Sequence, residues 1–194
     1  DHDVIIFVDS DEDGTVKWLE EVKDKYNLQY YVNPKLGEEL YGIGMAYDFC
    51  IEKSTTDIFM IFHADMYACP GLDKALFKHL KKGTIVCATR VEPSLHPPGP
   101  EKIVADYGIE PEEFDEQKFL NDLNKFKNSE KITNGIFAPW AIYKEDFWAV
   151  GGHDILFSPT SREDSDIFNR FHLVGYDFKQ TWEGFVYHMT CRGS

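Results

Sequence analysis

The stretch Asp57-Ile-Phe-Met-Ile-Phe-His-Ala-Asp65 decides the fold, because it leads an apolar strand directly into an acidic tip. Positions 58–62 are apolar without alternation, which predicts a strand buried on both faces. The Pro70-Gly71 pair that follows indicates a turn into a new helix. Ligands of open α/β sheets collect at the carboxyl ends of the strands. Asp65 is therefore expected to hold a divalent ion or, as an equally weighted alternative, to cap the next helix.

Strands and helices alternate on either side of this stretch. Apolar runs predict strands, and apolar residues at helical spacing predict helices, in the order strand 4–8, helix 15–26, strand 28–32, helix 42–53, strand 58–62, helix 72–81 and strand 84–89. This order predicts an α/β fold with a single domain, built on a mostly parallel, doubly wound, Rossmann-related sheet.

The composition of the sequence changes after Arg90. Residues 91–132 begin with Glu92-Pro-Ser-Leu-His-Pro-Pro-Gly-Pro100 and continue as an acidic, partly helical segment. This insertion is interpreted either as a mobile lid over a substrate or as a surface excursion. The pattern then predicts an apolar stretch at 133–143, a short helix near Lys144, a helix from Arg162 and a last strand at 178–187.

Composition excludes several classes of protein. With 194 residues, 43% hydrophobic and 15% aromatic, the chain can bury one sizeable core. A formal net charge of −14 argues against binding to nucleic acid, because basic side chains would have to replace counterions on the phosphate backbone. No apolar run reaches the length of a membrane span, and Asp1-His2-Asp3 lacks the basic start of a signal peptide.

The cysteines are expected to be reduced. Cys50, Cys69, Cys87 and Cys191 show no metal-ligand spacing, and three of them lie in or beside apolar segments. Reduced thiols are typical of the cytoplasm, so a cytoplasmic location is expected, with peripheral association with a membrane left open.

His63-Ala64-Asp65 is the first group of residues that suggests chemistry. Side chains two positions apart at a strand end face the same way, as in a D-x-D pattern. Mn²⁺ or Mg²⁺ held there would bridge the phosphates of a nucleoside diphosphate and stabilise its departure. Hard ions prefer oxygen ligands, so Asp65 is favoured over His63, which could instead pack at the sheet edge.

Three acids, Glu163, Asp164 and Asp166, mark the start of the helix predicted from Arg162. Carboxylates favour the positive end of a helix dipole, and that preference alone could place them there. The functional interpretation is that one carboxylate takes the proton of a sugar hydroxyl as it attacks, which is general base catalysis.

The two ends of the chain carry further candidates. His188 follows the last apolar strand and suits Mn²⁺, and the forked donors of Arg192 suit a diphosphate. A frayed terminus without a role is the alternative for both. The loop Asp9-Ser-Asp-Glu-Asp-Gly14 lacks the closing glutamate of a calcium loop, so contact with a nucleotide base or ribose is the better interpretation.

The order of these motifs along the chain resembles the A-fold nucleotide-sugar glycosyltransferases, especially inverting family 2. Residues 4–14 resemble the family's first nucleotide-binding loop, with Ser10 in place of its second acid. Phe147-Trp-Ala-Val-Gly-Gly-His-Asp154 is similar to the acceptor-side turn F-x-x-V-G-G-F-D, and Glu163-Asp164 is similar to the family's E-D pair.

The resemblance implies a metal-dependent transfer of a sugar from a nucleoside-diphosphate donor to a hydroxyl acceptor, with inversion, as in polysaccharide biosynthesis. It implies roles for residues in four groups. These are Asp9, Asp11, Asp65 and Arg192 toward the donor; Asp65, His188 and His63 toward the metal; Asp164 as base beside Glu163; and Trp140, Trp148, Gly152 and His153 toward the acceptor. Side chains 65, 164 and 188 are then expected to converge around one cleft.

The resemblance also divides the single domain 1–194 into a nucleotide-sugar half at 1–90, the insertion at 91–132 and an acceptor half at 133–194.

The family's usual first strand has no counterpart before Asp1, and His63 replaces the first acid of D-x-D. A non-catalytic remnant that binds a sugar or a protein is therefore the alternative function. A sugar-phosphate nucleotidyltransferase would need a glycine-rich basic phosphate loop, which the sequence lacks. The donor, the acceptor and the oligomeric state are left open.

Overall fold

The computed structural model describes residues 2–95, 97–159 and 162–189. The chain forms two compact units. The first consists of Asp1–Phe59 and Tyr143–Val174, and the second of Met60–Ile142 and Gly175–Ser194. Each unit is therefore assembled from two separate stretches of sequence.

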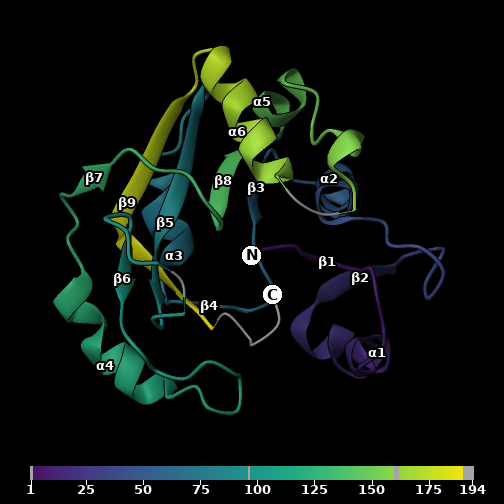
Figure 1. Ribbon diagram of the computed structural model, residues 1–194, viewed down its shortest axis with the longest axis horizontal. Coiled ribbons are helices and arrows are strands. Elements are labelled where there is room, and N and C mark those ends of the chain that lie inside the picture. The colour runs from purple at the N-terminus through teal and green to yellow at the C-terminus, as the bar shows by residue number, and fades with distance from the viewer. Residues whose placement is uncertain (1, 96, 160–161, 190–194) are drawn as a thin grey trace. The chain divides into compact units, whose positions relative to one another are not determined.

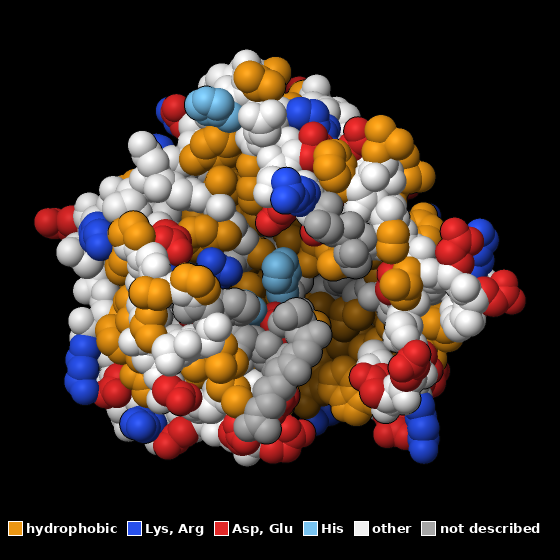
Figure 2. Space-filling view, viewed as in Figure 1, with side chains coloured by type: hydrophobic (Ala, Val, Ile, Leu, Met, Phe, Trp, Pro, Cys, Tyr) orange, Lys and Arg blue, Asp and Glu red, His pale blue; other side chains and the backbone are white. Residues whose placement is uncertain are grey.

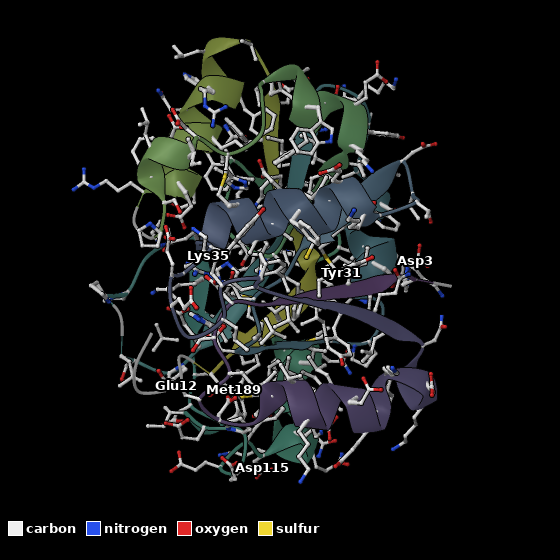
Figure 3. All side chains as sticks on the ribbon, turned by 90° about the vertical axis from the view of Figure 1, so that its right-hand side faces the viewer. Asp3, Glu12, Tyr31, Lys35, Asp115 and Met189 are labelled. Atoms are coloured by element: carbon white, nitrogen blue, oxygen red, sulfur yellow. The ribbon has the colours of Figure 1, made fainter. Side chains whose placement is uncertain are left out.

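The first unit is built on a two-stranded parallel sheet of β1 (Val4–Val8) and β2 (Leu28–Val32). The helices α1 (Thr15–Tyr26) and α2 (Ile43–Lys53) lie on opposite sides of these strands (Figures 1 and 3). The centroid of the Phe49 ring on α2 lies 5.2 Å from the ring centroid of Phe7 and 5.0 Å from that of Tyr31. The unit also contains α5 (Lys144–Ala149), the 3-10 helix η1 (Ile155–Phe157) and α6 (Glu163–Leu173).

The loops that follow β1 and β2 leave the sheet at the same edge, because the two strands are parallel. In Figure 3, Glu12 and Lys35 lie near one end of the strands and Asp3 lies near the other. The acidic loop 9–14 therefore lies at the carboxyl edge of this sheet, the edge at which α/β folds place their ligands.

The second unit holds most of a seven-stranded sheet. Its main path runs in the order β3 (Ile58–Ile61), β8 (Trp140–Tyr143), β5 (Thr84–Glu92), β9 (Asp177–His188) and β4 (Met66–Ala68). Two short strands lie off this path: β6 (Lys102–Val104) pairs with β5, and β7 (Ile132–Thr133) pairs with β9. The helix α3 (Leu72–Phe77) packs on β5 and β9, and α4 (Glu116–Phe126) lies within the insertion.

This sheet is mixed, so the prediction of a mostly parallel sheet was wrong. β5 is parallel to β9 and β6, but β8 is antiparallel to β5, and both β4 and β7 are antiparallel to β9. The direction of a strand in a sheet depends on the strand with which it pairs, and the apolar pattern of a segment does not specify that partner. The sequence analysis did not predict β4, whose three residues lie between the acidic tip at Asp65 and the turn at Pro70-Gly71.

Most of the other predicted elements are confirmed, with changes at their ends. Strands 4–8 and 28–32 and helix 15–26 have the predicted bounds. The helix predicted over 72–81 ends at Phe77, whereas the strand predicted over 84–89 continues to Glu92. The extension of β5 brings Glu92 into the sheet.

The insertion 91–132 contributes to the core of the second unit. On α4, Phe119 is fully buried and packs against the rings of Tyr107, Phe114 and Tyr187. The carboxylate of Asp115 caps this helix by accepting a hydrogen bond from the backbone of Lys118. Whether the insertion also acts as a lid stays a prediction.

The face of the molecule shown in Figure 2 carries charged side chains of both signs. On the face shown in Figure 2, Lys and Arg side chains are dispersed among Asp and Glu side chains. Within the described part of the chain, no helix is both long enough and apolar enough to cross a membrane.

Candidate functional site

The acidic tip after β3 lies against the end of the last strand. Residues 62–65 form the connection between β3 and β4, and β4 then pairs with β9 so that Met66 faces His188 across the ladder. The backbone N–H of Met189 donates to the carbonyl of Asp65, at 2.9 Å. Strand pairing therefore brings together two residues that are 123 positions apart in sequence.

His188 bridges two carboxylates. Its Nε2 atom lies 3.1 Å from Oδ2 of Asp65, and its Nδ1 atom lies 2.9 Å from Oε2 of Glu92. His188 is 8% exposed and Glu92 is 1% exposed, so this arrangement is largely shielded from water. The expected proximity of Asp65 and His188 is confirmed, and Glu92 is a neighbour that the sequence analysis missed.

Glu92 is the last residue of β5 and is held by two cations. Lys102 on β6 donates to its Oε1 atom, and Nε of Arg90 lies 3.9 Å from its Oε2 atom. The register of the parallel β5–β6 pair, with Arg90 opposite Lys102, places both cations beside it. The sequence feature that could have pointed to Glu92 is an acid at the end of a buried strand. It went unused because the strand was predicted to end before Glu92.

These groups shift one another's pKa values. Burial opposes the charged form of His188, but the Asp65 and Glu92 carboxylates raise its pKa to about 9. Burial opposes the ionised form of Glu92, but hydrogen bonds from His188 and Lys102 lower its pKa to about 2. The pKa of Asp65 is also lowered, because His188 and His63 outweigh the effect of burial. The arrangement therefore places an imidazolium between two carboxylates.

The donor atoms at Asp65 and His188 fit a divalent metal. The Oδ1 atom of Asp65 is buried and has no hydrogen-bond partner among the described residues, which leaves its lone pairs available. A carboxylate oxygen and an imidazole nitrogen are both ligands for Mn²⁺-type ions. Binding through Nε2 would require His188 to give up its Nε2 proton.

The described residues by themselves supply an incomplete set of ligands for a metal ion. Across residues 2–95, 97–159 and 162–189, no group of three or more His, Cys, Asp or Glu side chains is arranged to hold a metal ion. An ion held by one or two protein groups is typical of sites that share it with substrate phosphates. The geometry is thus compatible with a metal that binds together with a diphosphate.

In the first unit, Asp9 holds the loop that precedes α2. Its Oδ1 atom accepts hydrogen bonds from the backbone N–H of Tyr41 at 2.6 Å and from Nδ2 of Asn33 at 2.8 Å. Its Oδ2 atom accepts from the N–H of Gly42 at 2.9 Å. Gly42 has a φ of 95°, and a Cβ atom there would lie 2.3 Å from Oγ of Ser158, so only glycine fits this turn. Asp9 therefore fixes the entry to α2.

Replacing Asp9 by alanine is expected to destabilise the protein by about 2–3 kcal/mol, since three hydrogen bonds to one carboxylate are lost. Urea denaturation measures the effect. The matched control is Asp11→Ala in the same loop, where the carboxylate accepts, among the residues that the structure describes, only from the N–H of Val16 near the start of α1. This loss of a capping contact should cost about 1 kcal/mol. Equal midpoints for the two variants would contradict the bracing role of Asp9.

The turn at residues 151–154, after α5, is fixed by an acid on α2. Asp48 accepts from the backbone N–H of His153 through Oδ2, at 3.0 Å, and lies 2.5 Å from the Nδ1 atom of its ring through Oδ1. His153 is 7% exposed, and a Cβ atom on Gly44 would lie 2.9 Å from the Cβ atom of His153. Gly152 has no room for a side chain either, because a Cβ atom would lie 2.5 Å from Asp48. Gly152 and His153 thus shape the turn.

The three acids at the start of α6 have different environments. Asp166 forms an ion pair with Arg170, whose Nη1 atom also donates to the carbonyl of Val150, so Asp166 ties the helix to the turn after α5. The Oε2 atom of Glu163 is buried without a hydrogen-bond partner among the described residues. Asp164 is exposed, and its Oδ1 atom accepts from the backbone of Ser165. Asp164 is thus the accessible acid of the pair Glu163-Asp164.

Comparison with known proteins identifies the family. Residues 1–151, more than half of the chain, match the sequence profile described as glycosyl transferase family 2. The chain belongs to glycosyl transferase family 2. The suspected family is therefore confirmed. A search of curated proteins gave no match.

The fold of this family 2 chain is also found in a solved glycosyltransferase structure. A crystal structure of GalNAc-T7 with UDP, GalNAc and Mn²⁺ superposes with a TM-score of 0.71 at 12% sequence identity. The match covers 96% of this chain and 37% of that chain. The chain thus has an α/β glycosyltransferase A fold and spans well under half the length of GalNAc-T7.

The remaining candidates of this family 2 chain are not brought together by the described contacts. Trp140 lies in the sheet with 2% exposure, whereas Trp148 is 39% exposed and packs edge-on against Phe147. Arg192 lies outside the described residues. Asp164 belongs to the first unit and Asp65 and His188 to the second, so the expected convergence of the three stays a prediction.

Proposed function

We propose that this family 2 chain transfers a sugar from a nucleoside-diphosphate donor to a hydroxyl acceptor by direct displacement with inversion. The observation that carries the proposal is the pairing of Asp65 with His188 beside the unpartnered Oδ1 atom of Asp65. A bound Mn²⁺ or Mg²⁺ would neutralise charge on the departing diphosphate. Asp65 and His188 would hold that ion, and His63, which helps to lower the pKa of Asp65, would lie near it.

The acceptor is activated by Asp164 in this proposal. The carboxylate takes the proton of the acceptor hydroxyl as the hydroxyl oxygen attacks the anomeric carbon. The bond between that carbon and the diphosphate oxygen breaks on the opposite face, so the configuration inverts. The exposure of Asp164 supports this role, because a general base must reach its substrate. Glu163 is assigned to the same end of α6, as the less accessible acid.

The donor nucleotide is assigned to the loop 9–14 at the carboxyl edge of the first sheet. Asp9 contributes by fixing the neighbouring backbone, because its carboxylate already accepts three hydrogen bonds. Asp11 orders the start of α1 and lies in the same loop. Arg192 is proposed to bind the diphosphate. Trp148 is the better candidate of the two tryptophans for stacking on an acceptor sugar, since its ring is partly exposed.

Calorimetric titration with a panel of nucleoside diphosphates, with and without Mn²⁺, tests this function. We expect at least one nucleotide to bind in the presence of Mn²⁺ and to bind at least about tenfold more weakly after the ion is chelated, since diphosphate and metal share one site. Release of free sugar from the matching donor would then show catalysis. Binding without any sugar release would favour the non-catalytic remnant, and absence of metal-dependent binding would refute the proposal.

A further inference from the structure

Glu92 occupies a position that a surface ion pair does not explain. It is 1% exposed, its Oε1 atom accepts from Lys102, and its Oε2 atom lies 2.9 Å from Nδ1 of His188. The side chain of Lys102 is itself only 5% exposed. The two oxygens of one buried carboxylate therefore serve two different partners.

This contact determines which face His188 presents. An imidazole whose Nδ1–H donates to a carboxylate has its orientation fixed and its Nε2 atom directed away from that carboxylate. In this structure the Nε2 atom points at Asp65, whose Oδ2 atom is 3.1 Å away. Histidine ligands of metal ions commonly donate their other N–H to a carboxylate, which raises the basicity of the ligating nitrogen.

We propose that Glu92 is a positioning residue, which holds His188 so that Nε2 can bind the metal shared with Asp65, and that Lys102 in turn holds Glu92. This inference rests on the proposed metal-dependent function. It extends the site from the acidic tip after β3 to β5 and β6, and it gives the insertion 91–132 a role in the site, because that insertion supplies both Glu92 and Lys102.

A contribution to the stability of the fold does not by itself explain why Lys102, Glu92 and His188 form a connected series of charged groups that leads to Asp65. Burying an ion pair costs desolvation free energy that its attraction often only offsets, so an apolar pair of similar volume would serve the fold equally well. If Lys102 and Glu92 only stabilised each other, both oxygens of Glu92 could face the ammonium group. Instead Oε2 is turned to His188, which connects the pair to Asp65.

The test is the affinity for Mn²⁺ alone, followed by the electron paramagnetic resonance signal of the free ion. Glu92→Gln, which keeps the shape of the side chain, should weaken Mn²⁺ binding about 10- to 100-fold. Because this change leaves the buried Lys102 facing a neutral amide, a second variant, Glu92→Gln/Lys102→Met, removes that charge and should show the same loss. The matched control is Glu183→Gln on β9, which breaks the exposed pair with Lys78 and should change the affinity less than twofold.

A double-mutant cycle separates positioning from a general loss of structure. In a His188→Ala background, Glu92→Gln should change Mn²⁺ affinity less than twofold, because the residue that it orients is gone. An equal loss in both backgrounds would overturn the inference, as would a Glu92→Gln variant that binds Mn²⁺ as tightly as the wild type. If the wild-type protein binds no Mn²⁺, the proposed metal site itself fails, and the inference fails with it.

Discussion

Asp65→Asn is expected to remove metal-dependent donor binding and to lower the rate of sugar release at least about 100-fold. The substitution keeps the shape of the side chain but removes the negative charge that a divalent ion requires, and its amide nitrogen cannot serve as a ligand. Loss of one preorganised electrostatic contact commonly costs this much in rate. Calorimetry with Mn²⁺ and the donor nucleotide measures binding, and release of free sugar from the donor measures the rate.

The matched control for Asp65→Asn is Asp122→Asn in the same unit. Asp122 lies on α4, where its carboxylate pairs with Lys125 and accepts from the hydroxyl of Tyr107 at 3.0 Å. Asparagine can still accept from Tyr107, so this change should leave the affinity and the rate within about twofold of the wild type. Circular dichroism should show that both variants are folded. An Asp65→Asn protein that still binds the donor in a metal-dependent manner with wild-type affinity would rule out Asp65 as a metal ligand.

Asp164→Asn is expected to lower kcat by about 10²–10⁴-fold while the affinity for the donor changes less than twofold. An asparagine can accept a hydrogen bond but cannot take the proton of the attacking hydroxyl, so the loss falls on the chemical step. The rate of sugar release with water as the acceptor measures kcat, and calorimetry measures donor affinity. A fall in donor affinity with kcat unchanged would show that Asp164 contributes to binding and not to proton transfer.

Two further variants serve as a control and as a comparison for Asp164→Asn. Asp24→Asn changes an exposed acid on α1 in the same unit and should leave both quantities unchanged. Glu163→Gln compares the neighbouring carboxylate, whose Oε2 atom is buried, and should lower kcat less than Asp164→Asn does. If Glu163→Gln has the larger effect, the base is Glu163 and the assignment within the pair is reversed.

The alternation of strands and helices could be predicted from sequence because it depends on local patterns. The apolar run at 4–8 and the helical spacing at 15–26 have the predicted bounds, since each pattern matches the period of one element. The mixed character of the large sheet could not be predicted in this way. The direction of β4 and β8 depends on which strands they pair with, and pairing is a contact between distant residues.

The residues of the candidate site likewise fall into those that could be predicted from sequence and those that were missed. Asp65 could be recognised from its place at the end of a buried strand, and His188 from its place after the last one. Glu92 was missed, because its strand was predicted to end at residue 89 and its neighbours Lys102 and His188 come from other strands. The structure shows that the carboxylate of Asp9 braces the turn at Gly42, and the interpretation of Asp9 as a nucleotide contact stays a prediction.

By itself the sequence determined the family, the α/β class and the acids available for chemistry, because these depend on residue types and short-range spacing. Only the tertiary structure decided which of those acids have partners. His188 meets Asp65 and Glu92 through the register of β9 with its neighbouring strands. Such a register is set by the packing of whole strands, and a one-residue slip would turn every side chain to the other face.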